Sequence, residues 1–90
     1  MNKNDLVDRV AERVGLSKVI SSKAVEALLD AITGSLSSGT EVRLVGFGTF
    51  TVRRRKASEG RNPRTGERIQ IPASKVPKFR AGQGLRSAVN

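Results

Sequence analysis

The 90-residue sequence contains no cysteine, histidine, tryptophan or tyrosine, and three phenylalanines are its only aromatic residues. Without cysteine and histidine the chain has no thiol nucleophile, no disulfide, no imidazole base and none of the usual zinc ligand sets. We therefore expect a protein that is not an enzyme and that uses no metal, cofactor or small-molecule substrate. Three phenylalanines are also too few for a protein that stacks single-stranded bases on several exposed rings.

Long apolar runs are absent too. No stretch approaches the roughly 18 apolar residues of a membrane-spanning helix. The start of the chain, MNKNDLVDRVAE, carries charges where a signal peptide has its apolar segment. We therefore expect a cytoplasmic protein that does not act at a membrane.

The length predicts one domain. Its hydrophobic content of 37% is low for a small domain without disulfides or metal, so oligomerisation is expected.

The charge is unevenly distributed along the chain. Lys and Arg number 17 and Asp and Glu number 8, which gives a formal net charge of +9. Residues 1–45 hold six basic and six acidic side chains, whereas residues 46–90 hold eleven basic side chains and only two acidic ones. The first half is therefore neutral, and the second half carries the whole excess and predicts an anionic partner.

The first half of the chain has the pattern of two helices. Apolar residues recur at helical spacing over residues 3–14 and predict a helix that Gly15 stops. A second apolar stripe predicts a longer helix over residues 18–38, with Ser17 as its N-cap. This stripe is wide, so part of it is expected to face the chain's own sheet, a second subunit, or both.

From residue 41 the apolar pattern has a period of two. It predicts a β-hairpin with a glycine-rich turn at Gly46-Phe47-Gly48. Residues 53–75 contain too few apolar side chains to be buried, although residues 68–71 alternate like a strand. The turn signal Asn62-Pro63-Arg64-Thr65-Gly66 lies midway. We predict a projecting two-stranded arm, and the alternative is a disordered basic loop.

The arm favours a DNA duplex as its partner. Each leg has about ten residues and spans about 33 Å, close to one turn of DNA, so two arms of a dimer can embrace a double helix. Arginine outnumbers lysine here, which suits forked hydrogen bonds to phosphate and entry into a narrow minor groove. Pro63 is either a rigid apolar wedge that enters a base step or a simple turn former.

Two other patterns do not fit a catalytic or metal site. Gly60 and Gly66 are separated by five residues, whereas a phosphate-binding P-loop needs four and then Lys with Ser or Thr. Asp5, Asp8 and Glu12 lie near one another on the first predicted helix. Acidic residues there favour the helix dipole and pair with cations one turn away, so we interpret them as a solvated face.

Four strings, MNKNDLVDRVA, LVGFGTFTVRRR, GRNPRTG and KVPKFRAGQGLRSAVN, resemble the HU/IHF family of bacterial DNA-bending proteins over essentially the whole chain. The resemblance implies an α+β fold, in which two N-terminal helices and a short C-terminal helix form the base of an intertwined homodimer. A three-stranded antiparallel sheet extends into a long β-ribbon arm in each subunit. The resemblance places a helical dimerisation region at residues 1–40, the sheet body at 41–52 and 76–80, the DNA-binding arm at 53–75 and the C-terminal helix at 81–90.

The resemblance also implies a histone-like nucleoid protein. Such a protein binds double-stranded DNA with little sequence specificity, bends it by inserting its arms into the minor groove, and compacts the nucleoid. Pro63 would intercalate at the arm tip, beside Asn62. The other residues that the resemblance assigns to DNA binding are Lys3, Lys18, Gly46, Gly48, Arg53, Arg55, Arg61, Arg64, Lys75, Arg80 and Arg86. It assigns Phe47, Phe50 and Phe79 to the dimer core.

Other interpretations stay open at this point. The MNK start, the AVN end and the lack of a C-terminal extension resemble the HU branch more than the sequence-specific IHF branch. The dimer is a homodimer or a heterodimer with a paralogue. An RNA-binding or ribosome-associated protein is a further alternative, and a peripheral membrane binder a weaker one. Three positions depart from the family pattern, because Ser58 and Gln83 replace common cations and Gly84 replaces a better helix former.

Overall fold

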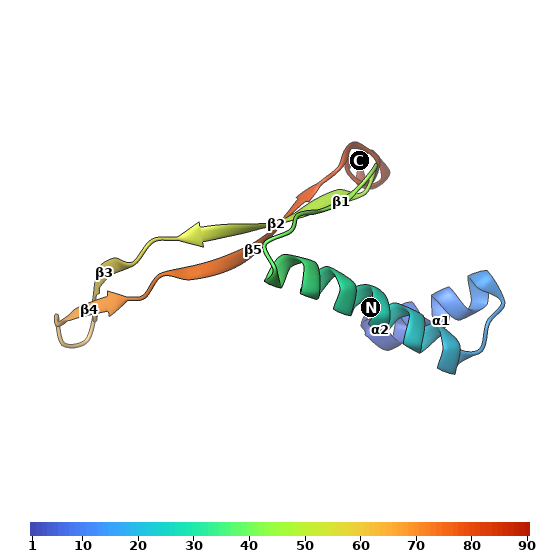
Figure 1. Cartoon of the computed structure of the whole chain (residues 1–90), viewed down its shortest axis with the longest axis horizontal. Helices are drawn as coiled ribbons and strands as arrows, with labels where there is room; N and C mark the ends of the chain where they lie inside the picture. Colours follow the sequence, from blue (N-terminus) through green and yellow to red (C-terminus); the bar gives the residue numbers. More distant parts are fainter.

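The computed structural model describes residues 1–90 as an elongated α+β chain, 58 × 29 × 29 Å along its principal axes (Figure 1). The helical hairpin α1–α2 lies at one end, the tip of a β-ribbon lies at the other, and a three-stranded sheet lies between them. The elements in chain order are α1 (Lys3–Val14), α2 (Lys18–Ser37), β1 (Val42–Leu44), β2 (Gly48–Arg55), β3 (Ser58–Arg61), β4 (Arg68–Ile71), β5 (Ser74–Ala81) and α3 (Gln83–Val89).

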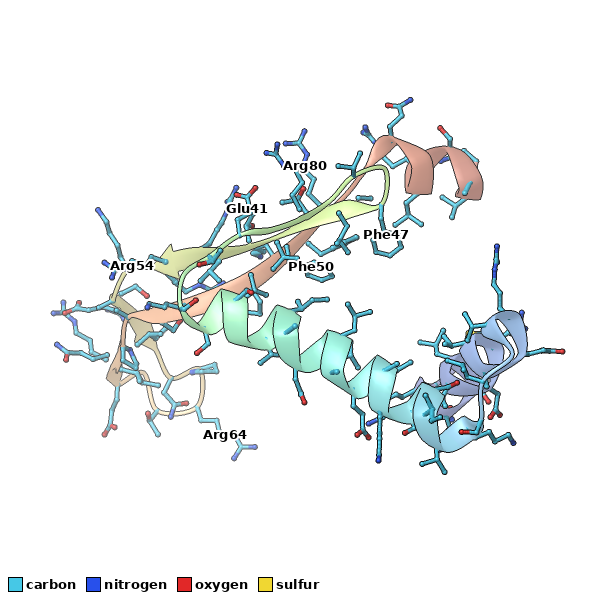
Figure 2. All side chains as sticks on the ribbon, turned by 45° about the vertical axis from the view of Figure 1, so that its right-hand side comes forward. Glu41, Phe47, Phe50, Arg54, Arg64 and Arg80 are labelled. Atoms are coloured by element: carbon cyan, nitrogen blue, oxygen red, sulfur yellow. The ribbon has the colours of Figure 1, made fainter.

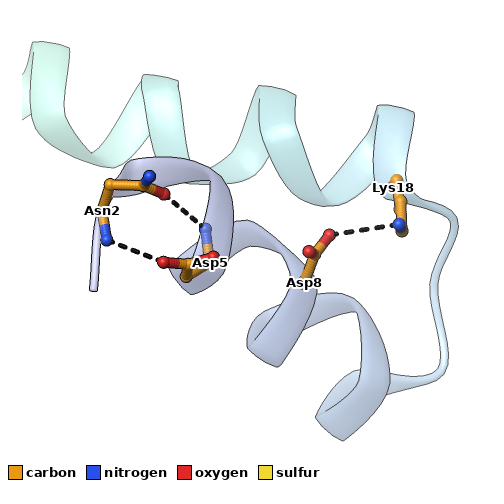
Figure 3. Close-up of polar contacts among 4 residues, drawn as sticks. All are labelled: Asn2, Asp5, Asp8 and Lys18. Atoms are coloured by element: carbon orange, nitrogen blue, oxygen red, sulfur yellow. Dashed lines mark hydrogen bonds and ion pairs between the residues drawn. The ribbon is translucent and has the colours of Figure 1, made fainter.

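The two long helices begin and end where local capping dictates. The N–H of Asp5 donates to Oδ1 of Asn2, and the N–H of Asn2 donates to the Asp5 carboxylate, each at 3.0 Å (Figure 3). Gly15 ends α1 in the left-handed region at φ 70°, and the Ser17 hydroxyl accepts the N–H of Ile20 at the start of α2. Both predicted helices are confirmed, with α2 one residue shorter. No helix combines the length and apolar character needed to cross a lipid bilayer.

The strands form two ladders. In the body, β2 is central and pairs antiparallel with β1 and β5. Beyond Arg55 and Ser74 the pairing stops at residues 56–57 and 72–73, where Pro72 has no N–H to donate to the ladder. Strands β3 and β4 then pair as a separate two-stranded ribbon. The predicted arm is confirmed as a ribbon and not a disordered loop, with an interruption at its root that the alternating pattern did not predict.

The C-terminal helix α3 docks on the β1–β2 turn through close backbone contacts. The N–H of Gly82 donates to the carbonyl of Phe47 (2.7 Å), and the N–H of Leu85 donates to the carbonyl of Gly46 (3.1 Å). A Cβ at Gly84 would lie 2.6 Å from the same Gly46 oxygen, so the observed approach needs glycine. A tertiary contact therefore accounts for Gly84, which helix propensity alone disfavours.

The single chain encloses almost no core. Only four of its 90 residues are buried, namely Val7, Ala11 and Ser21 in the helical hairpin and Gly48 in β2. Its accessible surface is 7762 Å², against about 5,100 Å² for a compact monomer of this mass. Its radius of gyration is 18.7 Å, against about 12 Å for a compact chain of this length. The apolar packing that the helical stripes predict is therefore incomplete within one chain.

Candidate nucleic-acid interface

One side of the three-stranded sheet is polar. Residues that pair directly across antiparallel strands place their side chains on the same side, and every second residue along a strand returns to that side. The register pairs Thr49 with Arg43 and Arg80, which lie on its two neighbouring strands. This side, the polar face, consists of Glu41, Arg43, Thr49, Thr51, Arg53, Arg55, Ser74, Val76, Lys78 and Arg80. Figure 2 shows Glu41 and Arg80 on the side of the sheet away from α2.

The positive charge of the polar face is largely uncompensated. Glu41 lies 3.6 Å from Arg43, and the other four cations of the face have no ion-pair partner in the chain. Threonine hydroxyls lie between these cations, and seven residues of the face, with Phe79, line a hollow of about 630 Å³. Phosphate oxygens are bound by such arginine, lysine and hydroxyl groups, so the polar face suits a phosphate backbone.

The structure regroups the residues predicted to bind DNA. It brings Arg53, Arg55 and Arg80 together on the polar face. Lys75 instead pairs with Arg54 and lies on the opposite side of the ribbon. The prediction omitted the other seven residues of the polar face, among them the cations Arg43 and Lys78 and the hydroxyl groups of Thr49, Thr51 and Ser74. The period-two alternation that predicted the strands was the signal that could have found them, because it also shows which side chains point away from the apolar side.

The opposite side of the sheet carries an apolar face, formed by Val42, Leu44, Phe50, Val52, Pro77 and Phe79, and the Arg54–Lys75 pair follows on the same side at the arm root. Figure 2 shows Phe47 and Phe50 on the side toward α2. The ring centroid of Phe79 lies 4.7 Å from that of Phe50 and 5.8 Å from that of Phe47. The three predicted dimer-core residues thus form one cluster, yet Phe47 and Phe79 are 48% and 45% exposed in the single chain. The cluster is an apolar surface without a cover.

The two glycines of the β1–β2 turn have different surroundings. Gly46 has φ 81°, which favours glycine, and its N–H makes no hydrogen bond within the chain. The neighbouring Val45 is 96% exposed, so this corner is open to a partner. Gly48 is buried, and a Cβ there would lie 2.4 Å from the Phe79 ring. Close packing against Phe79 therefore explains why residue 48 is glycine. The backbone N–H of Gly46 is a free hydrogen-bond donor of the kind predicted to bind phosphate.

Asn62 organises the tip of the arm. Its N–H donates to the carbonyl of Glu67 (2.9 Å), its carbonyl accepts the N–H of Gly66 (2.8 Å), and its Oδ1 accepts the N–H of Arg64 (2.9 Å). Gly66 has φ 72°, which lets the chain reverse direction. Pro63 and Arg64 are exposed on this turn. The turn joins β3 to β4 at the far end of the ribbon from the helices (Figure 1), and Figure 2 shows the Arg64 side chain there. The predicted turn is confirmed, and it presents Pro63 from a hydrogen-bonded loop.

The ribbon of the arm has two unlike sides. Arg61 pairs directly with Arg68, and Arg68 also lies 4.0 Å from Glu59 on the same side. The other side carries Ile69 and Ile71, which are about half exposed. The arm therefore has a cationic side with one acidic partner and a narrow apolar side, and neither side is covered by the rest of the chain.

Two predicted DNA-binding lysines lie away from the sheet, on the helical hairpin. Lys3 lies 3.7 Å from Glu26, and Lys18 lies 3.4 Å from Asp8 (Figure 3). Both pairs are exposed, and such surface pairs contribute little stability, so either lysine can exchange its partner at small cost. The acidic residues of α1 do not form a group that could hold a metal ion.

The sequence matches the family model of bacterial DNA-binding proteins over residues 1–90. The chain belongs to this family. One relative, DNA-binding protein HRm of Rhizobium meliloti (strain 1021), is 58% identical over 90 residues, which is all of both chains. DNA-binding protein HU of Geobacillus stearothermophilus is 55% identical over 89 residues, 99% of each chain. The resemblance inferred from the sequence motifs is confirmed.

Solved structures of bacterial DNA-binding proteins have the same fold. The Anabaena HU–DNA cocrystal structure matches with a TM-score of 0.91 and 49% identity, covering 99% of this chain and 97% of that one. HU from Thermotoga maritima matches with a TM-score of 0.72 and 32% identity over the full length of both chains. The predicted α+β fold, with its helical base, three-stranded sheet and β-ribbon arm, is therefore confirmed for this member of the bacterial DNA-binding family.

Proposed function

We propose that this protein binds double-stranded DNA with little sequence specificity, bends it and compacts the nucleoid, and that it catalyses no reaction. The polar face carries the proposal, because its four unpaired cations lead from the sheet into the root of the arm. These groups meet phosphates, which every sequence shares, so counterion release and backbone contacts dominate the affinity. Membership of the bacterial DNA-binding family supports the same conclusion.

The DNA-binding unit is a homodimer. One chain exposes about 2,600 Å² more surface than a compact monomer of its mass. The apolar face and the exposed side chains of Leu28 and Leu29 in α2 belong to this excess. Obligate dimers bury about 2,000 Å² or more in total, so a second, intertwined copy is of the right size to cover these residues. Phe47, Phe50 and Phe79 then lie in the shared core, where a paralogue could replace one subunit.

The arms bend the duplex from its minor groove. Pro63 is exposed at the tip, fixed in direction by the hydrogen bonds of Asn62, and it has no N–H that would need a partner inside a base step. Insertion of an apolar wedge costs a few kcal/mol of unstacking and kinks the duplex, as is known for minor-groove architectural proteins, HU and IHF among them. Arg61 and Arg64 beside the tip then reach the phosphates of the bent strand.

The sides of the body continue the path of the bent duplex. The free N–H of Gly46, together with Arg86 on the adjacent helix α3, supplies phosphate donors at the sheet corner. Lys3 and Lys18 supply further cations on the helical hairpin after leaving their acidic partners. None of these groups reads base edges, which fits the weak sequence preference of the proposal.

The experiment that tests the proposal measures bending and binding separately. The change is Pro63→Ala, and Pro77→Ala in β5 controls for the loss of a proline outside the arm tip. Energy transfer between the ends of a labelled duplex should show less bending with Pro63→Ala only, while affinity at low salt changes much less. Unchanged bending would remove Pro63 from the mechanism.

A second measurement compares nucleic acids. Two unrelated DNA sequences should bind with affinities within about threefold of each other, because phosphates supply the contacts. Equal binding of an RNA duplex would favour the RNA-binding alternative.

A further inference from the structure

A second cationic surface lies at the root of the arm, on the side opposite the polar face. Arg54 and Lys75 are directly opposite each other in the β2–β5 register. They share the side of the ribbon that carries Phe50, whereas Arg53 and Arg55 belong to the polar face. Arg54 lies where the ribbon leaves the body of the molecule (Figure 2). The cations of the arm root therefore face in two opposite directions.

The Arg54–Lys75 pair has no acidic neighbour. Neither side chain forms an ion pair in the chain, and like charges placed directly opposite on a sheet repel each other. The hollow beside them, about 470 Å³ in volume, is lined by Arg54, Arg55, Lys56, Ala57, Ala73, Ser74 and Lys75, with no acidic residue among them. The local arrangement is thus destabilising by itself, and a bound anion would remove the repulsion.

A duplex on the polar face does not supply that anion. Successive side chains of a strand point to opposite sides, so the ribbon itself separates such a duplex from Arg54 and Lys75. The phosphate backbone of another duplex segment has the matching charge, and guanidinium and ammonium groups side by side suit its oxygens. We propose that the Arg54–Lys75 pair is a second phosphate-binding site, through which one protein dimer bridges two duplex segments. This inference rests on the proposed binding of the first duplex by the polar face.

The test separates the two duplexes. A duplex immobilised on beads captures the protein and then a second, fluorescent duplex, and anisotropy of a short free duplex measures single-duplex binding. Both are measured at about 0.15 M salt, where the Debye length of about 8 Å limits long-range charge effects. The variant is Arg54→Glu, which places a carboxylate opposite Lys75. The matched control is Arg53→Glu, the neighbouring arginine on the polar face.

The outcomes distinguish the inference from the proposed function. Arg54→Glu should lower capture of the second duplex about tenfold and change single-duplex affinity by less than about threefold, because it removes contacts to the second backbone only. Arg53→Glu should lower both. Thermal unfolding should show Arg54→Glu at least as stable as the parent, since it replaces repulsion by attraction.

Three results would overturn the second site. The first is a parent protein that binds one duplex but captures no other. The second is unchanged capture with Arg54→Glu. The third is a loss of single-duplex affinity equal to that of Arg53→Glu, which would show that the pair contacts the first duplex. Failure of the parent to bind even a single duplex would instead refute the proposed function.

Discussion

Lys78 offers a sharp test of the polar face, because it is not among the DNA-binding residues that the family resemblance assigns and the sheet register places it there. The four unpaired cations of the face with Arg61 and Arg64 make six per chain, so a dimer has at most twelve phosphate contacts from these groups. These twelve contacts alone give a slope of log K against log salt of about −11. Lys78→Ala removes one contact per subunit and should make the slope less negative by about 1.8.

The assay is titration of a short labelled duplex at several salt concentrations. Because the two slopes differ by about 1.8, the ratio of the parent's binding constant to that of the variant should fall about twelvefold when the salt is raised from about 50 to about 200 mM. Lys23→Ala is the matched control, because Lys23 is an exposed lysine on α2 without an ion pair, away from the sheet. Its slope should equal that of the parent. If Lys78→Ala also leaves the slope unchanged, this side of the sheet does not seat the duplex.

Two further predictions concern a buried hydroxyl and the arm tip. Ser21 is fully buried and its hydroxyl has no hydrogen-bond partner, so Ser21→Ala should raise the free energy of unfolding by about 1–2 kcal/mol in urea titrations. Ser22→Ala controls for helix propensity, and a less stable Ser21→Ala variant would show that the hydroxyl is bonded in the dimer. Asn62→Ala removes the acceptor for the Arg64 N–H and should reduce DNA bending more than Asn62→Ser, whose hydroxyl can still accept. Full bending by Asn62→Ala would contradict a positioning role.

Local features of this fold could be predicted from the sequence because neighbouring residues decide them. The end of α1 follows from the left-handed glycine at Gly15, and of the two asparagines that the sequence offers as its N-cap, Asn2 and Asn4, the structure uses Asn2. The turn at the arm tip follows from two residues close together in the sequence. The Asn62 side chain accepts the N–H of Arg64, and Gly66 adopts a positive φ. Interactions between residues so close in the sequence form in many tertiary contexts, so residue pattern and residue propensity are enough to predict these helix ends and turns.

The interruption at the arm root and the role of Gly84 could not be predicted in the same way. The β2–β5 ladder stops before residues 56–57 and 72–73, and β3 and β4 resume the pairing beyond them in the same register, so only these two pairs are missing. Gly84 is unfavourable for a helix by propensity, and the reason for it is a carbonyl at Gly46 that lies 38 positions earlier in the chain. Contacts between such distant segments depend on how the elements pack.

The sequence by itself determined the element types, the neutral helical half, the basic half and the family, because charge, periodicity and motif spacing are local properties of the chain. Only the tertiary structure decided which cations act together. The antiparallel register placed Lys78 and Arg80 beside Thr51 and Thr49 on the polar face, and it placed Lys75 beside Arg54 on the other side. A strand sends successive side chains in opposite directions, so the pairing between strands, and not the number of arginines, defines the two cationic surfaces of the sheet and arm root.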